Sequence, residues 1–321
     1  MRDAAILQRR FQQLTTNIED FIHGKPEVVK LAVVCLLAQG HLLIEDVPGV
    51  AKTSLAKAIA RSIAGATVKR IQFTPDLLPS DVTGVQVYDQ STGGFEFRQG
   101  PVFTNILLGD EINRASPKTQ SALLEVMSEY QVTVDGEPLG VPYPFLCVAT
   151  QNPVEYQGTY ALPEAQLDRF MMRINIGYPE NLEDEVRILA DGVARRKPEE
   201  LKSVMELDDL RLMIQAVQGL HIAPELQNYI ATIVRSTRSH NDVRLGASPR
   251  GGIALAAAAQ AYAAGSGRPY VLADDVKAVA VPVLNHRLLL TAEARVQQQT
   301  PESIVREILK TTPVPRQPMD S

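Results

Sequence analysis

The chain has 321 residues, of which 45% are hydrophobic and 21% charged, a composition typical of a globular protein of about two domains. The 32 basic and 37 acidic residues give a formal net charge of −5, which argues against binding DNA or an anionic membrane over the whole surface. Cys35 and Cys147 lie in apolar segments, so we expect no disulfide framework and a cytoplasmic location. Apolar runs such as residues 31–38 are too short to cross a membrane, and we expect no integral membrane segment or signal peptide.

Two helices are predicted within the first 40 residues. An almost wholly apolar run at residues 28–38 predicts that the second helix is buried. The first helix has one apolar stripe, formed by Ile6, Phe11, Leu14, Ile18 and Phe21.

Short apolar runs then alternate with helical segments such as 54–64 and 117–128. The runs predict strands at residues 41–45, 106–110, 145–150 and 172–176. This alternation is typical of an α/β domain with a parallel sheet covered on both faces. Beyond Pro179 we predict no strand, and helical periodicity recurs at 181–191, 207–218, 224–239, 249–264 and 273–280. We therefore predict an α/β domain over residues 1–179, an all-helical domain over 180–310 and a disordered tail over 311–321.

Two hairpins are predicted to interrupt the α/β domain. In the first, near residues 82–98, apolar residues alternate with polar ones on both sides of the tip at 91–94. In the second, near residues 130–142, the pair Asp135-Gly136 is a strong turn signal.

The loop DVPGVAKT, after the first predicted strand, has features of a phosphate-binding loop. Such a loop needs free backbone N–H groups, a lysine for the phosphates and a hydroxyl for Mg²⁺, and Lys52 and Thr53 supply the last two. The glycine pattern is incomplete, because Asp46 and Ala51 stand where glycine is usual and Gly49 alone is left. Ala51 would be tolerated only with a negative φ. The alternative is an ordinary turn between a strand and a helix.

Polar residues follow two further predicted strands. Asp110 could hold Mg²⁺ and Glu111 could deprotonate a water that attacks the γ-phosphate, although a solvated acidic strand end is the alternative. Asn152 could hydrogen-bond the γ-phosphate, or it could simply begin a turn. Arg169 and Arg250 could stabilise the charge that develops in phosphoryl transfer, or they could be solvated surface charges.

These motifs together resemble the MoxR family of AAA+ ATPases over nearly the whole chain. The segments that carry the resemblance are LLIEDVPGVAKTSLA, ILLGDEINRASPKTQSALLEVM, VATQNP, LPEAQLDRF and LGASPR, in this order. The resemblance implies an AAA+ P-loop core with a C-terminal all-helical lid, and ATP and Mg²⁺ as cofactors. Lys52 and Thr53 match the Walker A motif, Asp110 and Glu111 match Walker B, and Asn152 matches sensor one.

Further roles are implied only by this resemblance. Arg169 resembles the arginine finger that reaches a neighbouring subunit's nucleotide, and Arg250 resembles sensor two, which contacts the γ-phosphate in its own subunit. Ile22 and Gly24 match the stretch that contacts adenine, and Arg114 matches an interface position. The nucleotide-binding loop would comprise Val47, Pro48, Gly49, Val50, Ala51, Lys52, Thr53 and Ser54, with Thr53 and Asp110 as the Mg²⁺ ligands.

The predicted function is therefore a Mg²⁺-dependent ATP hydrolase that forms a ring, expected to be hexameric. The resemblance implies chaperone-like remodelling, maturation or activation of protein complexes, with a von Willebrand factor A domain protein as the partner. One alternative is a nucleic-acid motor of the same fold, which the acidic balance and the absence of tryptophan disfavour. Another is a scaffold that binds ATP with little turnover, which Glu111 disfavours. His286 and Arg287 are interpreted as a structural cap or an interface pair.

Overall fold

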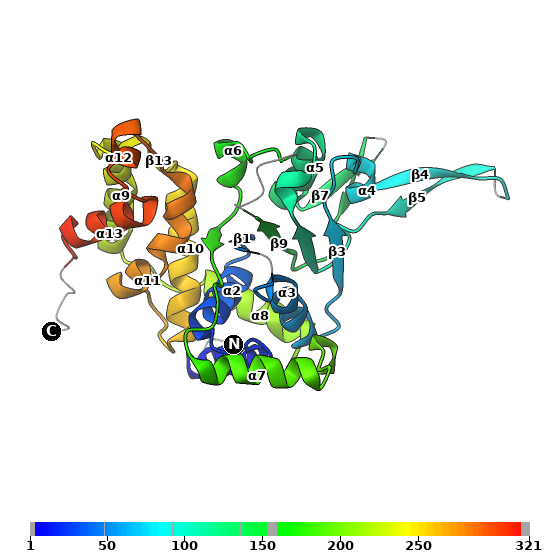
Figure 1. Cartoon of the computed structure of the whole chain (residues 1–321), viewed down its shortest axis with the longest axis horizontal. Coiled ribbons are helices and arrows are strands. Elements are labelled where there is room, and N and C mark those ends of the chain that lie inside the picture. The colour runs from blue at the N-terminus through cyan, green and yellow to red at the C-terminus, as the bar shows by residue number, and fades with distance from the viewer. Residues whose placement is uncertain (1–3, 48, 92, 135, 153–158, 316–321) are drawn as a thin grey trace.

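A five-stranded parallel sheet forms the centre of the computed structural model, which describes residues 4–47, 49–91, 93–134, 136–152 and 159–315 (Figure 1). The strands lie in the order β10 (Met172–Ile174), β1 (Leu42–Glu45), β9 (Leu146–Gln151), β6 (Ile106–Asp110) and β3 (Val68–Gln72). Four of them confirm the predicted strands. The edge strand β3 is missing from the prediction, because Lys69 and Arg70 interrupt the apolar pattern that marks the others.

Helices cover both faces of this sheet, as predicted. Leu42 and Ile44 of β1 lie in one apolar cluster with α1 (Ala4–Glu19), α2 (Pro26–Leu37) and α3 (Lys52–Arg61), and Leu43 lies in a second cluster with α5 (Pro117–Glu129). Successive side chains of a strand point to opposite faces, so the two clusters mark the two covered faces.

Two details of the predicted helices are wrong. The apolar stripe of α1 begins with Leu7, which is buried, whereas the predicted Ile6 is 36% exposed. The helix predicted to reach residue 64 ends at Arg61, and Ile63–Ala64 forms the short strand β2. The second difference is a shift of three residues, close to the scale on which helix ends commonly vary.

The C-terminal half is helical, and its five predicted helices are present. They are α7 (Leu182–Val193), α8 (Leu207–Gln218), α9 (Pro224–Ser239), α10 (Pro249–Gly265) and α11 (Ala273–Leu284). The structure adds α12 (Ala292–Val296) and α13 (Pro301–Thr311). The prediction that no strand follows residue 179 is wrong, because β11 (Met205–Glu206), β12 (Val243–Leu245) and β13 (Leu289–Leu290) are present. Strands this short carry too few residues for a period of two to be visible.

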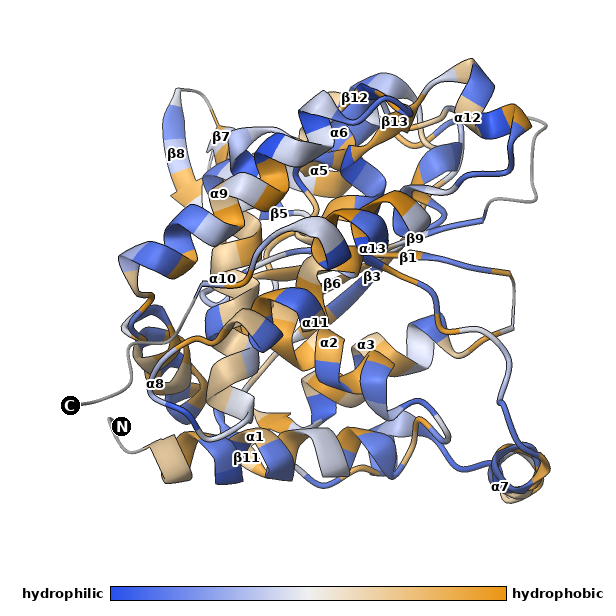
Figure 2. Cartoon of the chain, turned by 90° about the vertical axis from the view of Figure 1, so that its left-hand side faces the viewer, coloured by the Kyte–Doolittle hydropathy of each residue, from blue (hydrophilic) through white to orange (hydrophobic). Residues whose placement is uncertain are grey.

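The helical half shares one apolar core with the sheet. Helix α10 lies against α1 and α2, and Figure 2 shows hydrophobic residues concentrated where α2, α10 and α11 meet. Gly265 permits the close approach of α10 to α1, since a Cβ there would lie 2.9 Å from the Phe11 ring. Strand β11 of the C-terminal half also pairs with β2 of the N-terminal half. The two halves are thus joined by strand pairing as well as by the core, and the domain boundaries near residues 179 and 310 stay predictions.

The predicted tail begins inside the fold rather than beyond it. Thr311 ends α13 and Thr312 is buried, whereas residues 316–321 lie outside the described part of the chain. Within the described residues, no helix combines the length and the apolar character needed to cross a membrane.

The two hairpins occur where the sequence predicts them. Strands β4 (Gly84–Asp89) and β5 (Gly94–Gln99) pair antiparallel, and so do β7 (Gln131–Val134) and β8 (Glu137–Gly140). Figure 1 shows the β4–β5 hairpin projecting far from the sheet on the side opposite to the C-terminal helices. Tyr88 and Phe95 face each other on this hairpin with ring centroids 5.4 Å apart, and Phe95 is 73% exposed.

Candidate functional site

The sequence-predicted catalytic residues meet in one pocket of about 450 Å³ beyond the carboxyl ends of β1, β6 and β9. This edge is where open parallel sheets bind their ligands. The described residues that line it are Gly49, Val50, Ala51, Lys52, Thr53, Ser54, Arg70, Gln72, Asp110, Glu111, Thr150 and Asn152. The structure therefore brings the predicted Walker A, Walker B and sensor-one positions together.

The phosphate-binding loop ends where α3 begins, at Lys52. The first N–H groups of a helix have no intrahelical acceptor, so the start of α3 presents free donors and a positive dipole end to the pocket. Lys52 Nζ donates to the Asp46 carbonyl oxygen at 2.6 Å, which holds the ammonium group over the loop. Gly49 has a φ of +88°, and a Cβ there would meet nothing within 4 Å, so the space above the loop is open.

Ala51 contradicts the expectation of a negative φ. Its φ is +58° and its ψ 21°, which is the left-handed region that L residues rarely adopt. The residue is the N-cap of α3, and the chain must turn there to bring the loop over the helix start. An alanine in this conformation costs roughly 1–2 kcal/mol relative to an unstrained one, so the loop stores strain at the binding site.

Asp46 stabilises the start of the same loop through hydrogen bonds, although glycine is usual at this position. Its Oδ2 accepts hydrogen bonds from the backbone N–H groups of Ile176 at 2.7 Å and Gly177 at 2.6 Å, and its Oδ1 accepts from Val47 N at 2.8 Å. These bonds tie the end of β1 to the segment after β10. Val47 is thereby fixed beside the loop but is absent from the described lining of the pocket, and Pro48 lies outside the described residues.

The predicted Mg²⁺ carboxylate, Asp110, is buried at the end of β6. Arg70 Nε donates to its Oδ2 at 2.6 Å, and Thr150 Oγ1 donates to its Oδ1 at 3.3 Å. A carboxylate and the Thr53 hydroxyl are the hard oxygen ligands that Mg²⁺ prefers, and both line the pocket with Lys52. The residues present therefore fit a phosphate-bound Mg²⁺ ion.

Glu111 follows directly and adopts a φ of +59°. Its Oε2 accepts hydrogen bonds from Gln72 Nε2 and Arg114 Nη1, both at 2.9 Å. Arg114 thus contacts a residue of the site, and its position at a subunit interface stays a prediction. Arg70 and Gln72 are absent from the residues predicted from the sequence. Their spacing of two on β3 is the signal that could have identified them, since it places both side chains on one side of a strand next to β6.

Asn152 and Ile22 occupy positions consistent with their expected roles. Asn152 is buried in the lining of the phosphate pocket, and its carbonyl oxygen accepts a hydrogen bond from Asn113 Nδ2 at 3.4 Å. Ile22 lines an adjoining pocket of about 470 Å³, which shares Gly49, Val50, Ala51 and Ser54 with the phosphate pocket and reaches α7.

Gly24 has a different position. It is absent from the described lining of that adjoining pocket, and its φ is +69°. A Cβ there would lie 2.4 Å from Asp184 Oδ2, so the glycine is needed for a close turn against α7. Its neighbours His23 and Lys25 line the pocket, and the adenine contact of Gly24 stays a prediction.

Arg169 and Arg250 lie at the opposite end of the sheet from the phosphate pocket. Arg169 Nη1 donates to Ser128 Oγ at 2.8 Å and to the Leu124 carbonyl oxygen, near the end of α5. Burial lowers the pKa of His41 to about 4, and the positive charge of Arg250 acts in the same direction, so Arg250 lies near the residue that precedes β1. The four residues of β1 span roughly 13 Å at about 3.3 Å per residue.

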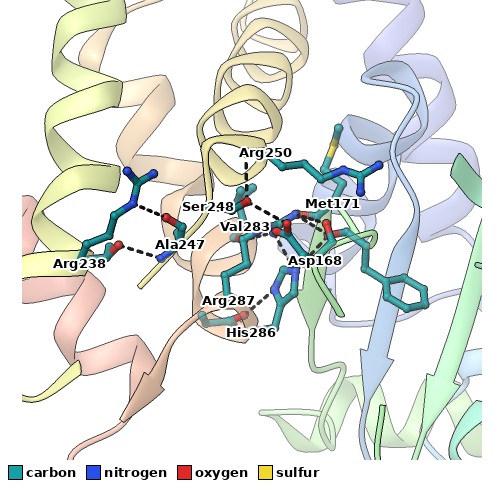
Figure 3. Close-up of polar contacts among 12 residues, drawn as sticks. Asp168, Met171, Arg238, Ala247, Ser248, Arg250, Val283, His286 and Arg287 are labelled. Carbon is teal, nitrogen blue, oxygen red and sulfur yellow. Dashed lines mark hydrogen bonds and ion pairs between the residues drawn. The ribbon is translucent and has the colours of Figure 1, made fainter. Parts of the chain in front are cut away.

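Neither arginine is among the described residues that line the two pockets. The expectation that Arg250 contacts the γ-phosphate of its own subunit is therefore not met in this structure. The reason is the placement of the lid: α10 begins at Pro249 beside residues 168–171, which precede β10, as Figure 3 shows.

Comparisons with known proteins give the same assignment. Residues 41–172 match the model of the ATPase family associated with various cellular activities (AAA), and residues 235–308 match the AAA lid domain. YeaC of Bacillus subtilis, an uncharacterized protein, is 51% identical over 94% of this chain and 93% of its own length. The chaperone MoxR1 of Mycobacterium tuberculosis is 42% identical over 94% of this chain and 81% of its own length.

A solved structure supports the fold. The crystal structure of a proposed ATPase from Cytophaga hutchinsonii superimposes with a TM-score of 0.90 at 35% identity, covering 98% of this chain and 97% of that chain. The parallel sheet and the helical lid agree with these similarities. The chain therefore belongs to the MoxR family of AAA+ ATPases.

Proposed function

We propose that this protein hydrolyses ATP in a Mg²⁺-dependent reaction at the phosphate pocket. The observation that carries the proposal is the convergence of Lys52, Thr53, Asp110, Glu111 and Asn152 on one pocket at the end of the sheet. A lysine and a helix start bind phosphates, and two carboxylates side by side can serve a metal ion and an attacking water.

Each residue has a distinct task in this proposal. Lys52 and the N–H groups at the start of α3 bind the phosphates, and Thr53 and Asp110 hold the metal ion. Glu111 accepts the proton of the attacking water, and Asn152 orients the γ-phosphate. The bound Mg²⁺ would supply positive charge that stabilises the phosphates as charge develops on them.

The observed contacts describe a resting arrangement of the two carboxylates. Arg70 neutralises Asp110, while Arg114 and Gln72 hold Glu111 by the same oxygen. Hydrolysis requires these hydrogen bonds to be exchanged for the metal ion and a water molecule. The exchange is available because the Arg70 and Arg114 side chains are 53% and 42% exposed and can move into solvent.

We further propose that the catalytic unit is a ring, hexameric as in the resemblance, with the nucleotide between two subunits. Arg169 lies against α5 and Arg250 lies near His41, both away from their own phosphate pocket, where they can serve a neighbour's nucleotide. Arg250 then acts across the interface, together with the arginine finger.

The ring would remodel or mature protein complexes in the cytoplasm. Support comes from the family and from the name of the similar chaperone MoxR1. A protein with a von Willebrand factor A domain is the partner that the resemblance favours. The projecting β4–β5 hairpin, with its exposed Tyr88 and Phe95, is a surface suited to a client or partner.

The experiment that tests hydrolysis compares the parent protein with Glu111→Gln and Lys52→Ala. Phosphate release should be almost abolished in both. Only Glu111→Gln should keep the thermal stabilisation by Mg·ATP, which amounts to about 2.7 kcal/mol at 100 times the dissociation constant. Turnover of Glu111→Gln within a few-fold of the parent would overturn the assignment of the base.

A further inference from the structure

The Asp168 carboxylate joins the sheet domain to the lid through both of its oxygens (Figure 3). Arg287 Nε donates to Oδ1 at 2.7 Å, and Ser248 Oγ donates to Oδ2 at 2.8 Å. Asp168 lies between the short helix α6 (Glu164–Leu167) and β10, whereas both of its partners belong to the lid. One side chain of the core is thus held by two separate segments of the lid.

Arg287 also binds the backbone of the same segment. Its Nη2 donates to the carbonyl oxygens of Asp168 at 3.1 Å and Phe170 at 2.7 Å, and its Nη1 donates to that of Met171 at 3.1 Å. The Arg287 side chain is only 2% exposed, so its charge depends on the Asp168 carboxylate. Burial lowers the pKa of the Arg287 guanidinium, and the Asp168 charge opposes that shift. The contact is therefore a buried clasp and not a surface ion pair.

The clasp lies between the two arginines that we assign to catalysis. On the lid side, Ser248 is the N-cap of α10, and its Oγ accepts a hydrogen bond from Arg250 N at 3.1 Å. On the core side, Asp168 directly precedes Arg169, whose guanidinium is bound to α5. A displacement of the start of α10 would therefore move Asp168 through its hydrogen bond to Ser248, and would move Arg169 through the backbone.

We propose that Asp168 is a positioning residue that couples the lid orientation to Arg169, so that Arg250 and Arg169 reach a neighbour's nucleotide together. The proposal rests on the proposed interface role of the two arginines. Loss of the clasp should not change the affinity for nucleotide, because Asp168 is absent from the described lining of both pockets. Loss of the clasp should lower kcat and leave KM unchanged.

The first test is Asp168→Asn, which keeps the size of the side chain and an acceptor for Arg287 but removes the charge. We expect kcat to fall at least tenfold while KM for ATP stays within about threefold. The fall in kcat caused by Asp168→Asn should be smaller in an Arg169→Ala background than in the parent, because part of its effect acts through Arg169. A multiplicative loss in the double variant, or an unchanged kcat in Asp168→Asn, overturns the proposal.

A matched control is Asp275→Asn. Asp275 is 1% exposed and pairs with Arg268 inside the lid, so the variant loses a buried ion pair that does not join lid and core. Its kcat should stay within about twofold of the parent. An equal loss of kcat in both variants would mean that the effect of Asp168→Asn is general destabilisation, and the proposal would be wrong.

A second measurement does not depend on hydrolysis. Fluorophores on Glu129→Cys at the end of α5 and Val296→Cys in the lid report the distance between core and lid, and native Cys35 and Cys147 are fully buried and escape labelling. With Mg²⁺ and a nonhydrolysable ATP analogue, the parent should give one narrow distance distribution and Asp168→Asn a broad one. Identical distributions overturn the coupling.

The kinetic test and the distance measurement distinguish an error in the role of Arg169 from an error in the role of Asp168. If Arg169→Ala keeps parental turnover, the arginine-finger role is wrong, while the distance measurement still decides whether Asp168 fixes the lid. Ser248→Ala, which removes one contact of Asp168, gives a second route should Asp168→Asn fail to fold. Ser248→Thr retains a hydroxyl and should restore both kcat and the narrow distribution, and a failure to restore them would count against the clasp.

Discussion

Arg70 Nε lies 2.6 Å from Oδ2 of Asp110, so a cation of the chain itself neutralises the carboxylate that we assign to Mg²⁺. A Mg²⁺ ion held by this carboxylate would compete with Arg70 for its negative charge. The Arg70 side chain is 53% exposed, which makes it the weaker competitor, because a partly exposed ion pair contributes only about 0.2–1 kcal/mol.

The Arg70→Ala variant should therefore need less Mg²⁺ than the parent. We expect the Mg²⁺ concentration for half-maximal thermal stabilisation at fixed ATP to fall about two- to fivefold, measured in a Glu111→Gln background to prevent hydrolysis. Arg98→Ala, on the exposed β4–β5 hairpin, is the control and should leave the titration unchanged. Weaker ATP binding by Arg70→Ala at saturating Mg²⁺ would instead show that Arg70 binds phosphate.

Mixed assemblies should reveal catalysis shared between subunits. Arg169→Ala and Arg250→Ala should each bind ATP with turnover reduced by about 1000-fold or more. Adding Lys52→Ala subunits should restore part of the activity to either variant, because an intact arginine can then serve an intact loop next to it. A mixture of Lys52→Ala and Glu111→Gln stays inactive if those residues act in their own subunit. Proven co-assembly without recovery would place the arginine's action in its own subunit.

The strained Ala51 predicts a stabilising substitution. Ala51→Gly should raise the free energy of unfolding by about 0.5–1 kcal/mol, because relief of the positive φ outweighs the entropy that glycine adds to the unfolded chain. Ala190→Gly in the exposed middle of α7 is the control, and it should lower stability by about 1 kcal/mol. Urea unfolding at neutral pH measures both. A loss of stability in Ala51→Gly would mean that the loop is not strained.

Acid should destabilise the fold through its buried histidines. Burial lowers the pKa of His41 to about 4 and that of His286 well below its usual value, so both are neutral in the folded chain. The unfolded chain binds these protons near pH 6.5, so stability is full above that pH and falls as pH drops toward 4. His41 alone accounts for a loss of about 3 kcal/mol across this window.

Urea unfolding at pH 7, 6 and 5 measures this slope. His41→Gln should show a smaller decrease than the parent. Equal slopes would assign the acid sensitivity to carboxylates instead.

The exposed hairpin should serve clients and not chemistry. Tyr88→Ser combined with Phe95→Ser removes the paired rings at its surface, and basal ATPase activity should stay within about twofold because no hairpin residue is among the described lining of the phosphate pocket. Partner-stimulated turnover should be lost. Loss of basal activity to the level of Glu111→Gln would assign the hairpin to ring assembly.

Much of the site could be predicted because its residues follow apolar strands. Asp110 is the last residue of β6, Asn152 directly follows β9, and Lys52 follows β1 after the loop 46–51; these strands have buried apolar patterns, and parallel strands end at one edge. Arg70 and Gln72 escaped prediction because β3 is an edge strand with exposed cations, which hides its periodicity. A strand of this kind becomes visible only through its pairing with β6.

Other features depend on long-range packing that no local pattern encodes. The position of Arg250 follows from how α10 docks on α1 and α2, and the φ of Ala51 follows from how the loop joins β1 to α3. The two- and three-residue strands of the C-terminal half form only because distant segments meet, as Val243 does with Leu290. Sequence periodicity therefore predicts elements better than it predicts their mutual placement.

The apolar cluster that joins the lid to the sheet limits how the lid can move. Leu255 and Ala258 of α10 belong to the same cluster as Val29 and Val33 of α2 and Leu42 of β1. Rotating the lid away from the sheet would expose this apolar surface to water, at a free-energy cost of about 25 cal/mol per Å². We therefore expect any nucleotide-driven motion to consist of small sliding displacements between packed helices, which is shear and not hinge opening.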